Sequence, residues 1–489
     1  MYSYILITNY FVIFPIFFNV LLFFSFLLFL LSYTGVDSYF NKSIRVSFKL
    51  GFMYSFLLAS VLLFIKIYLI LSLRTIGSAL AWYAYSGLYV NIGIMRASIV
   101  LPLFADIILL LAIFLSLLCW VLLSERSLLD NYFNLAYFLV FILLTVNMVY
   151  SVNLYHMFLF FELIFLPSLY FVYTTGYSKK VDKAIFYLLL WTYSGSFVVL
   201  LGLCYLYVTY QTGNIAVLAQ QSFSIFERSF LFWIFFLGFG VKVPVWPFHY
   251  WLTKVHVEAP AGFSIFLSGF LVKTALYCLY FFIFLFIGPI TRILSGVIIF
   301  WGFMDASFRM WGVQDLKKLI AFATIQEMNL ILFFLVFGSN HLLITMNLFI
   351  AVHGLLSGLL FFLVDQVQKR TQTRNLAYLG GLGAHLTILP FFIWTALLIF
   401  RGFPIFIKFF IEWELVLIIF ESFYIVGVVI FLVSSLVGVL GFVRAWFIVL
   451  YGQPKLKAAN YTDMNKKDIY IAASLVLVLM YLNFCLVLF

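Results

Sequence analysis

The sequence predicts an all-α, polytopic membrane protein with about 14 transmembrane helices. Hydrophobic residues make up 66% of the 489 residues and charged residues only 9%, too few polar side chains to cover a water-soluble core. Apolar runs of about 20 residues, each long enough to cross a bilayer, recur along the whole chain. Proline- and glycine-containing breaks in two of these runs predict discontinuous helices, numbered 7 and 12 in chain order.

The predicted spans fall into four segments. Residues 1–130 hold helices 1–3 and a stretch, 72–102, that is too polar for a span and rich in interfacial aromatic residues, so we expect it on the outer surface. Residues 131–288 hold helices 4–8, 289–451 hold helices 9–13, and 452–489 hold a loop and helix 14. The apolar runs are centred near Phe18, Leu58, Leu111, Phe141, Ile164, Val198, Phe235, Phe270, Val297, Leu330, Phe349, Trp394, Ile430 and Leu477.

Positive charge alternates between the two sides of the predicted bundle. Most of the 28 Lys and Arg residues fall in odd-numbered connections, among them Lys254 and Lys317. Because Lys and Arg accumulate in loops that face the cytoplasm or the matrix, the odd connections are predicted on that side and both termini on the other. The positive excess is scattered over short loops rather than gathered on one face, so it does not indicate nucleic-acid binding.

The sequence gives no sign of a cofactor in this chain. Cys119, Cys204, Cys278 and Cys485 are isolated in apolar runs, without the paired spacing of zinc, iron–sulfur or redox disulfide sites. A Gly-rich dinucleotide turn and a phosphate-binding lysine motif are also absent. The amino terminus lacks a targeting pattern, so we expect synthesis close to the membrane.

Five ionisable residues interrupt the predicted spans. Glu162 lies in helix 5, Lys242 in helix 7, Lys273 in helix 8, His353 in helix 11 and Glu412 in helix 12. An ionised side chain at the middle of a bilayer costs about 2.5 to 3.5 kcal/mol even on lenient scales. Each of these residues therefore needs a partner or a function.

Structural explanations compete with functional ones at some of these positions. Snorkelling of the side chain to the headgroups explains Lys66, Arg401 and Arg444 equally well, because near a helix end a long basic side chain can reach the headgroups. It fails for Glu162, whose side chain is too short to reach an interface. Lys242 precedes two prolines, which leaves a helix-end charge open, and His353 alone is more often a hydrogen-bonded core histidine.

The two helix breaks are potential ion sites. Val243-Pro-Val-Trp-Pro interrupts helix 7, and Arg401-Gly-Phe-Pro interrupts helix 12. Backbone groups freed at membrane depth have to line a cavity or be buried in protein. Transporters place ion sites at such discontinuous helices.

The charges near these breaks are spaced as in an internal repeat. The sequence separation between Lys242 and Glu412 is nearly the same as that between Glu162 and Glu327. Near-equal offsets over an odd number of helices are what two inverted five-helix repeats produce.

The chain also resembles a known family. The string Val241-Lys-Val-Pro-Val-Trp-Pro-Phe-His-Tyr-Trp-Leu-Thr-Lys-Val-His-Val-Glu-Ala-Pro resembles the helix 7 signature of the antiporter-like membrane subunits of respiratory complex I, the NADH:ubiquinone oxidoreductase, and its end resembles the chain 4 branch. Three later blocks agree in order: residues 270–277 with helix 8, 314–322 with helix 10 and 353–361 with helix 11. The resemblance covers roughly residues 155–447, and residues 1–130 match in hydropathy alone.

The resemblance implies roles for the intramembrane charges. Glu162 and Lys242 would form an ion pair near the inlet of a proton half-channel. Lys273 would be the central proton carrier, His353 a relay, and Glu412 the terminal carrier on the broken helix 12.

It also implies a location and partners. His249 would extend the proton line beside the break in helix 7. The chain would lie in the mitochondrial inner membrane, with its odd loops in the matrix and both termini on the intermembrane side. It would contact membrane lipids and two neighbouring antiporter-like subunits. NADH, FMN, the iron–sulfur clusters and ubiquinone would bind to partner subunits.

The chain departs from the family pattern in helices 10 and 12. Gln326-Glu327-Met328 stands where the family usually has a histidine. Bulky residues replace the small residues expected before Glu412. One of them, Lys408, lies four positions before Glu412, where it can form an i,i+4 pair and change the proton affinity of the Glu412 carboxylate. Glu414 is a further charge without an assigned role.

Three other functions remain open at this stage. A free-standing or Mrp-type cation/proton antiporter would use the same fold and carriers. A haem-binding quinone oxidoreductase would use His341 and His353, twelve residues apart on one helix, but it needs a matching pair, and His249 and His256 are separated by seven residues across a proline-broken stretch. A structural spacer would retain the charges without using them.

Overall fold

The computed structural model describes residues 100–123, 128–175, 181–338, 342–453 and 462–487. Within these ranges almost every residue is helical, and β-structure is limited to two isolated bridges, Asn153 with Asn214 and Asp315 with Asn375. The all-α prediction is therefore confirmed. Predicted helices 1 and 2 and most of the stretch 72–102 lie outside the described residues.

The chain divides into two compact units, which are described separately. Unit 1 comprises residues 1–171 and 203–223, and unit 2 comprises residues 172–202 and 224–489. Helices α6 (Leu154–Thr175) and α7 (Val181–Tyr210) each contribute residues to both units.

Unit 1 is built from α4 (Val100–Leu123), α5 (Leu128–Val149), parts of α6 and α7, and the short α8 (Ile215–Leu218). Helix α4 packs against α5. The Leu154 backbone N–H donates to the Gly213 carbonyl at 2.9 Å, and the Ile215 N–H donates to the Val152 carbonyl at 3.3 Å. These bonds tie the beginning of α6 to the turn that follows α7.

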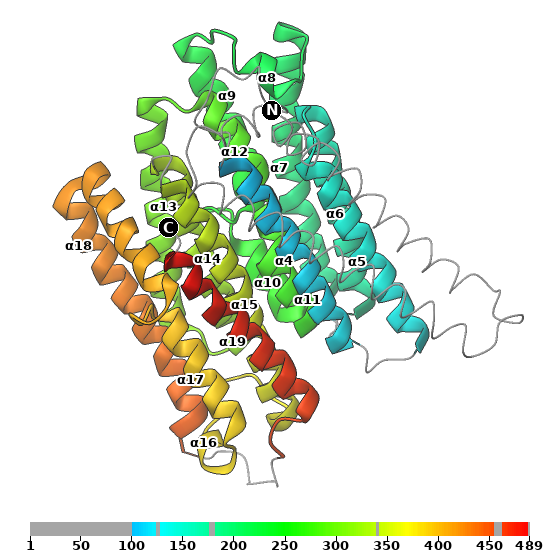
Figure 1. Cartoon of the computed structure of the whole chain (residues 1–489), viewed down its shortest axis with the longest axis vertical. Coiled ribbons are helices and arrows are strands. Elements are labelled where there is room, and N and C mark those ends of the chain that lie inside the picture. Colours follow the sequence, from blue (N-terminus) through cyan, green and yellow to red (C-terminus); the bar gives the residue numbers. More distant parts are fainter. Residues whose placement is uncertain (1–99, 124–127, 176–180, 339–341, 454–461, 488–489) are drawn as a thin grey trace, which may run out of the picture. The chain divides into compact units, whose positions relative to one another are not determined.

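Unit 2 contains the remaining helices, whose arrangement is shown in Figure 1. They are α9 (Ile225–Lys242), α10 (Tyr250–Glu258), α11 (Ala261–Phe266), the π-helix η2 (Leu267–Leu271), α12 (Val272–Phe286), α13 (Pro289–Gly312), α14 (Leu316–Phe337), α15 (Leu342–Thr371), α16 (Leu382–His385), α17 (Ile388–Phe400), α18 (Ile407–Tyr451) and α19 (Lys466–Val487).

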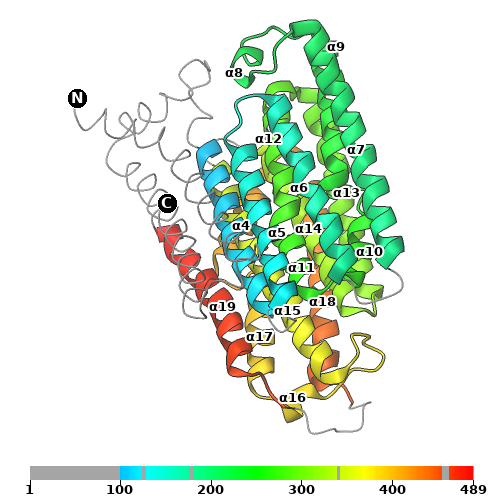
Figure 2. The same ribbon diagram turned by 90° about the vertical axis from the view of Figure 1, so that its right-hand side faces the viewer.

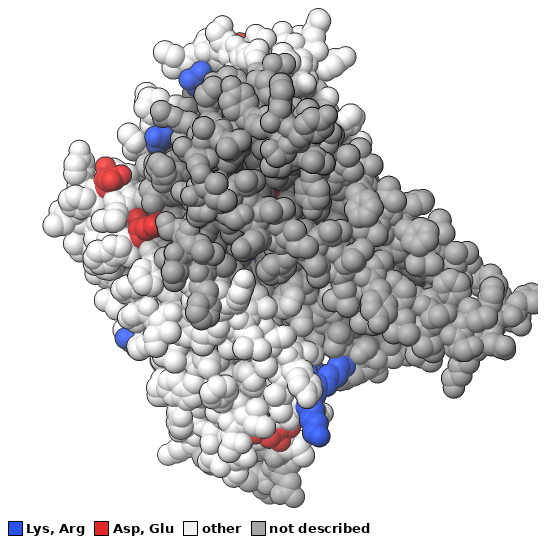
Figure 3. Space-filling model, in the orientation of Figure 1, with Lys and Arg blue, Asp and Glu red and all other residues white. Residues whose placement is uncertain are grey.

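Seven helices among the described residues are long and apolar enough to cross a membrane. Helices α14 and α15 are buried in the centre of unit 2, whereas α13 and α18 expose large apolar side chains such as Trp301 and Leu436. On the face in Figure 3, few charged side chains interrupt the described surface. A polytopic membrane protein is thus confirmed, and the total of 14 helices stays a prediction.

Helix α18 consists of two helices. Its 45 residues would span about 68 Å if straight, about twice the thickness of a bilayer core. Tyr424 interrupts it with φ 54° and ψ −163°, which is not helical. The residues on either side of Tyr424 correspond to the end of predicted helix 12 and to predicted helix 13.

Both predicted helix breaks are present. Helix α9 ends at Lys242 and α10 begins at Tyr250, while α17 ends at Phe400 and α18 begins at Ile407. The Trp251 indole N–H donates to the Val241 carbonyl at 2.8 Å, so one freed backbone oxygen at the first break is satisfied inside the protein.

Several odd-numbered connections meet at one end of unit 2. The Arg374 guanidinium pairs with Asp315 at 2.8 Å and donates to the Val257 carbonyl at 2.7 Å, and Arg370 donates to the Thr462 carbonyl at 2.9 Å. In Figure 2, α16 lies at the lower end of unit 2 and the beginning of α9 at the opposite end. The predicted alternation places all odd-numbered connections on the same side of the membrane, and these contacts agree with it.

Several basic residues predicted in connections lie in helices instead, among them Lys254 and Lys317. Lys254 is inside α10, because the chain resumes helical structure directly after the proline break. Lys317 is in the first turn of α14 and only 1% exposed, and its ammonium donates to the Ala259 carbonyl at 2.9 Å. That carbonyl accepts one of the three hydrogen bonds that the buried ammonium can donate.

Asp463, distant in sequence, caps the N-terminus of α17. Its carboxylate accepts hydrogen bonds from the backbone N–H groups of Thr387, Ile388 and Leu389 at 2.9, 2.8 and 3.3 Å, and from that of Met464 at 2.7 Å. Burial raises the pKa of the Asp463 carboxyl, but these N–H donors lower it by more, so its pKa lies below the ordinary value.

We expect Asp463→Ala to lower the free energy of unfolding by about 1 kcal/mol, because three N–H groups at the beginning of α17 lose their acceptor. Thermal unfolding of the detergent-solubilised protein measures the change. Asp463→Asn is the matched control, since its amide oxygen still accepts. Equal losses for the two variants would contradict the capping role.

The stabilisation by Asp463 should also depend on pH. A depressed folded-state pKa means that the contribution is present above the unfolded carboxyl pKa of about 3.9 and is lost as the pH falls through the lower folded value. The difference in melting temperature between the parent and Asp463→Ala should therefore shrink with acidification. A difference that grew with acidification would contradict this sign.

Candidate functional site

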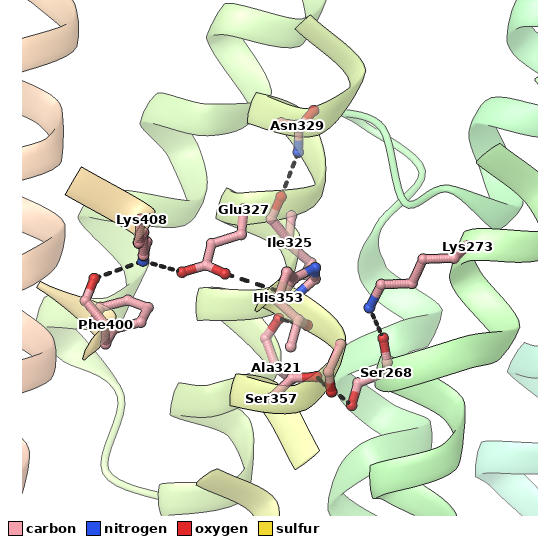
Figure 4. Close-up of polar contacts among 12 residues, drawn as sticks. Ser268, Lys273, Ala321, Ile325, Glu327, Asn329, His353, Ser357, Phe400 and Lys408 are labelled. Atoms are coloured by element: carbon pink, nitrogen blue, oxygen red, sulfur yellow. Dashed lines mark hydrogen bonds and ion pairs between the residues drawn. The ribbon is translucent and has the colours of Figure 1, made fainter. Parts of the chain in front are cut away.

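Lys273 is held in the centre of unit 2 by an irregular helix. It is fully buried and lies at the beginning of α12, just after the π-helix η2. A π-turn replaces the i,i+4 hydrogen bonds of an α-helix with i,i+5 bonds. The Lys273 ammonium donates to the Ser268 carbonyl in this turn (Figure 4).

Serine hydroxyl groups connect this turn with α15. The Ser268 and Ser357 Oγ atoms are 3.2 Å apart, and Ser357 lies one helical turn after His353. His353 is 1% exposed, and neither of its ring nitrogens has a hydrogen-bond partner among the described residues. The imidazole is therefore available to take up or release a proton.

Glu327 on α14 faces His353. The His353 Nε2 and Glu327 Oε2 atoms are 4.0 Å apart, and both side chains are almost completely buried. A cavity of about 10 Å³ is lined by Glu327, His353 and Ser357. That volume is close to the smallest that holds one water molecule. A water molecule there would lie between the three groups and could pass a proton from one to another.

Lys408 forms a buried ion pair with Glu327 (Figure 4). Its ammonium also donates to the Phe400 carbonyl at 2.6 Å and lies 4.3 Å from the centre of the Phe400 ring. Lys408 is 2% exposed and Glu327 is 3% exposed. The carboxylate, the carbonyl at the end of α17 and the aromatic face together replace the hydration of the ammonium.

Glu412 is the second carboxylate beside Lys408. Its Oε1 atom lies 3.6 Å from the Lys408 ammonium, as the i,i+4 spacing predicted, and 32% of its side chain is exposed. Gly402 permits this position: its φ is +66°, and a Cβ there would meet Glu412 Oε2 at 2.7 Å. A cavity of about 290 Å³ is lined by Glu327, Lys408, Glu412 and the exposed Arg401.

The other predicted site residues belong to other helices. Lys242 is the last residue of α9 and 1% exposed, and Glu162 lies half-buried on α6 in unit 1. The pairing of these two residues stays a prediction. His249 precedes α10, and its Nε2 atom lies 3.4 Å from Asp305 of α13, which also pairs with Arg309.

Sequence reasoning missed the role of Glu327 and assigned Lys408 to Glu412 alone. The missed signal was the repeat spacing, because the separation between Lys242 and Lys408 equals that between Glu162 and Glu327 to within a single position. From the sequence, Lys242 was instead matched with Glu412, although their separation agrees less closely with that between Glu162 and Glu327. The structure places His353 beside Glu327, Glu327 beside Lys408 and Lys408 beside Glu412, while Lys273 donates to Ser268, whose hydroxyl lies against Ser357. The roles predicted for Lys273, His353 and Glu412 stay predictions.

The arrangement suits proton transfer. Among the described residues, no group of three or more His, Cys, Asp or Glu side chains is placed to hold a metal ion. His341, which the haem alternative requires, lies outside the described residues. The buried polar groups are instead a lysine, a histidine and an acid–base cluster on neighbouring helices, all of which gain and lose protons without a cofactor.

Known proteins are similar to this chain in sequence and in fold. The family described as "NADH:quinone oxidoreductase/Mrp antiporter, TM" matches residues 151–438. The NADH-ubiquinone oxidoreductase chain 4 of Paramecium tetraurelia is 36% identical over 335 residues, which cover 68% of this chain and 71% of that protein. The NADH-quinone oxidoreductase subunit M of Rickettsia conorii is 26% identical over 473 residues, 92% of each chain.

A solved structure agrees at the level of the fold. One chain of the respiratory complex I from Thermus thermophilus superimposes with a TM-score of 0.66 at 19% sequence identity. The match covers 79% of this chain and 80% of that chain.

We expect Gly402→Ala to displace the Glu412 carboxylate, because alanine disfavours the positive φ and its Cβ would overlap with Glu412 Oε2. The left-handed conformation alone should lower the free energy of unfolding by about 1 to 2 kcal/mol. Gly312→Ala is the control, since a Cβ there has no atom within 4 Å. Thermal unfolding that ranked Gly312→Ala as the more damaging change would contradict this geometry.

Proposed function

The chain belongs to the NADH:quinone oxidoreductase/Mrp antiporter family of membrane proteins, and from this we propose that it is a chain 4-type subunit that moves protons across the inner membrane within an NADH:ubiquinone oxidoreductase. The observation that carries the proposal is the buried row of ionisable groups in unit 2. It runs from Lys273 through His353 to Glu327, Lys408 and Glu412, which lie on α12, α15, α14 and α18.

The two lysines of this row have different surroundings. Lys408 is paired with a carboxylate, whereas Lys273 has a carbonyl oxygen as acceptor and no carboxylate within ion-pair distance among the described residues. A buried charge without a counter-charge costs about 3 to 5 kcal/mol. Lys273 is therefore the lysine we expect to release its proton, toward His353.

The inlet of this row is proposed from the sequence. Glu162 and Lys242 would hold each other ionised, and loss of the Glu162 charge would leave the Lys242 ammonium unpaired and ready to give up its proton. The position of Lys242 at the end of a broken helix supports this role. His249 would extend the row beside the break, with Asp305 stabilising its protonated form.

The energy for transport would come from partner subunits. Moving one charge against the membrane potential costs about 2.3 kcal/mol per 100 mV. We propose that NADH, FMN, the iron–sulfur clusters and ubiquinone bind to those partners, and that two antiporter-like subunits flank this chain. We also propose that the shared end of unit 2 formed by Asp315, Arg370 and Arg374 faces the matrix, because basic residues accumulate there.

The test is Lys273→Met in the assembled complex in sealed membrane vesicles. We expect NADH-driven proton uptake to fall at least tenfold, since a positioned proton-transfer group contributes about 10²-fold or more to the rate. Lys369→Met is the control, because Lys369 is 42% exposed and pairs with Asp365 at the end of α15. Proton uptake unchanged in Lys273→Met would favour a structural spacer and reject the proposal.

A cation/proton antiporter is the second candidate, because the matching family includes Mrp antiporters. Native electrophoresis with an NADH-oxidation stain separates the two functions. We expect the chain to migrate with the NADH-oxidising assembly. Migration apart from that activity, with sodium-dependent proton exchange, would favour the antiporter.

A further inference from the structure

Two departures from the family pattern meet in the structure. Glu327 stands in the segment where the family usually has a histidine, and Lys408 stands where small residues are expected. They are 81 residues apart in sequence and on different helices, and they form a buried ion pair. Without Lys408, Glu327 would have no counter-charge at this depth, and without Glu327, the Lys408 ammonium would have only Glu412, 3.6 Å away.

The Lys408 ammonium is shared between two carboxylates. It contacts Glu327 Oε1 and lies 3.6 Å from Glu412 Oε1, while the Phe400 carbonyl holds it at 2.6 Å from one side. A lysine ammonium has three donors; two of them reach Glu327 and the Phe400 carbonyl, and Glu412 lies within ion-pair distance but just beyond a hydrogen bond. A small movement of the ammonium therefore changes which carboxylate it neutralises.

The charges in this group do not balance when both acids are ionised. Glu327 and Glu412 would then carry two negative charges against the single positive charge of Lys408. The exposed Arg401, which also lines the cavity, has access to solvent or headgroups that screen it. Two carboxylates beside one ammonium favour the uptake of one proton, which makes the group neutral.

Its two acids face different surroundings. Both acids border the cavity of about 290 Å³, but Glu327 is 3% exposed and its Oε2 atom lies 4.0 Å from His353 Nε2, whereas 32% of the Glu412 side chain is exposed. Lys408 lies between them. A proton that enters from His353 therefore meets Glu327 first and leaves from Glu412.

We propose that Glu327, Lys408 and Glu412 form one proton-loading cluster, in which protonation of Glu327 releases the Lys408 ammonium to protonate Glu412. This inference rests on the proposed function, since it takes the proton from the row that begins at Lys273. It makes Lys408 a proton carrier rather than a structural counter-ion.

The transfer balances in three steps. The His353 imidazolium gives its Nε2 proton to the Glu327 carboxylate, leaving a neutral imidazole and a neutral carboxylic acid. The Lys408 ammonium, no longer held by a negative charge at Glu327, gives a proton to Glu412 and becomes a neutral amine. The amine then takes the proton of Glu327, which restores the Glu327–Lys408 ion pair and leaves Glu412 protonated.

Infrared difference spectroscopy of the assembled complex counts the protonated acids. The C=O stretching band of a carboxylic acid is separated from that of a carboxylate and shifts in D₂O. We expect the parent cluster to show one such band at neutral pH. Glu327→Gln and Glu412→Gln should each abolish it, because Lys408 then has one carboxylate to neutralise.

Removal of the lysine should have the opposite effect. Lys408→Met should give two carboxylic-acid bands, since both acids lose their counter-charge. The double variant Glu327→Gln/Lys408→Met should return to one band, and it leaves no unpaired charge, so it keeps the test valid if Lys408→Met alone fails to assemble. Asp365→Asn, at the partly exposed pair with Lys369 away from the cluster, is the control and should leave the band unchanged.

The outcomes separate this inference from the proposed function. Retention of the parent band in both Glu327→Gln and Glu412→Gln would overturn the cluster, even if Lys273→Met abolishes proton uptake. Loss of the band in both variants would support the cluster, even if Lys273→Met pumps normally and the proposed route fails. A purely structural ion pair would leave Glu412 ionised in the parent, and its band would be absent from the start.

Discussion

The buried ion pair between Glu327 and Lys408 is the interaction on which the centre of unit 2 depends. Both side chains are almost fully buried, so neither charge is exposed at the protein surface. An isolated charge at this depth costs several kcal/mol, and the pair is stable because each group neutralises the other and the Phe400 carbonyl satisfies a further donor. The same pair links helices α14 and α18 and places His353 and Glu412 on its two sides. Stability of the core and the route for protons therefore rest on one contact.

Irregular backbone brings the remaining groups to this pair. The π-turn before Lys273 contains the Ser268 carbonyl that accepts a hydrogen bond from its ammonium, and the Phe400 carbonyl, at the break between α17 and α18, accepts one from Lys408. Gly402 in that break has a conformation open to few other residues and leaves room for the Glu412 carboxylate. A regular helix would have used these carbonyl groups in its own ladder. The irregular segments thus supply the polar contacts that the apolar side chains cannot.

Much of the fold followed from composition and local pattern. Long apolar runs, the proline-marked breaks and the buried Lys273 and His353 were predictable because a bilayer allows few alternatives for such sequences. The i,i+4 contact of Lys408 with Glu412 was predictable because both lie on one helix. The contact of Lys408 with Glu327 was not predictable, since the two residues are 81 positions apart and meet only because α14 packs against α18. The π-turn also escaped prediction, because nothing in the residues 267–271 distinguishes it from a regular apolar helix. The cap of α17 by Asp463 is again a contact between distant segments.

The central claim is that the buried charges are held by mutual pairing rather than by separate contacts with lipid headgroups or water. A double-mutant cycle on the free energy of unfolding, with Glu327→Gln, Lys408→Met and the double variant, tests it most directly. Lys408→Met should cost about 3 to 5 kcal/mol because it leaves Glu327 without its counter-charge, and Glu327→Gln should cost less because Glu412 still lies 3.6 Å from the Lys408 ammonium. The double variant should cost less than the sum of the two single changes. Additivity of the two changes to within about 0.5 kcal/mol would show that the two charges do not depend on each other and would contradict the account.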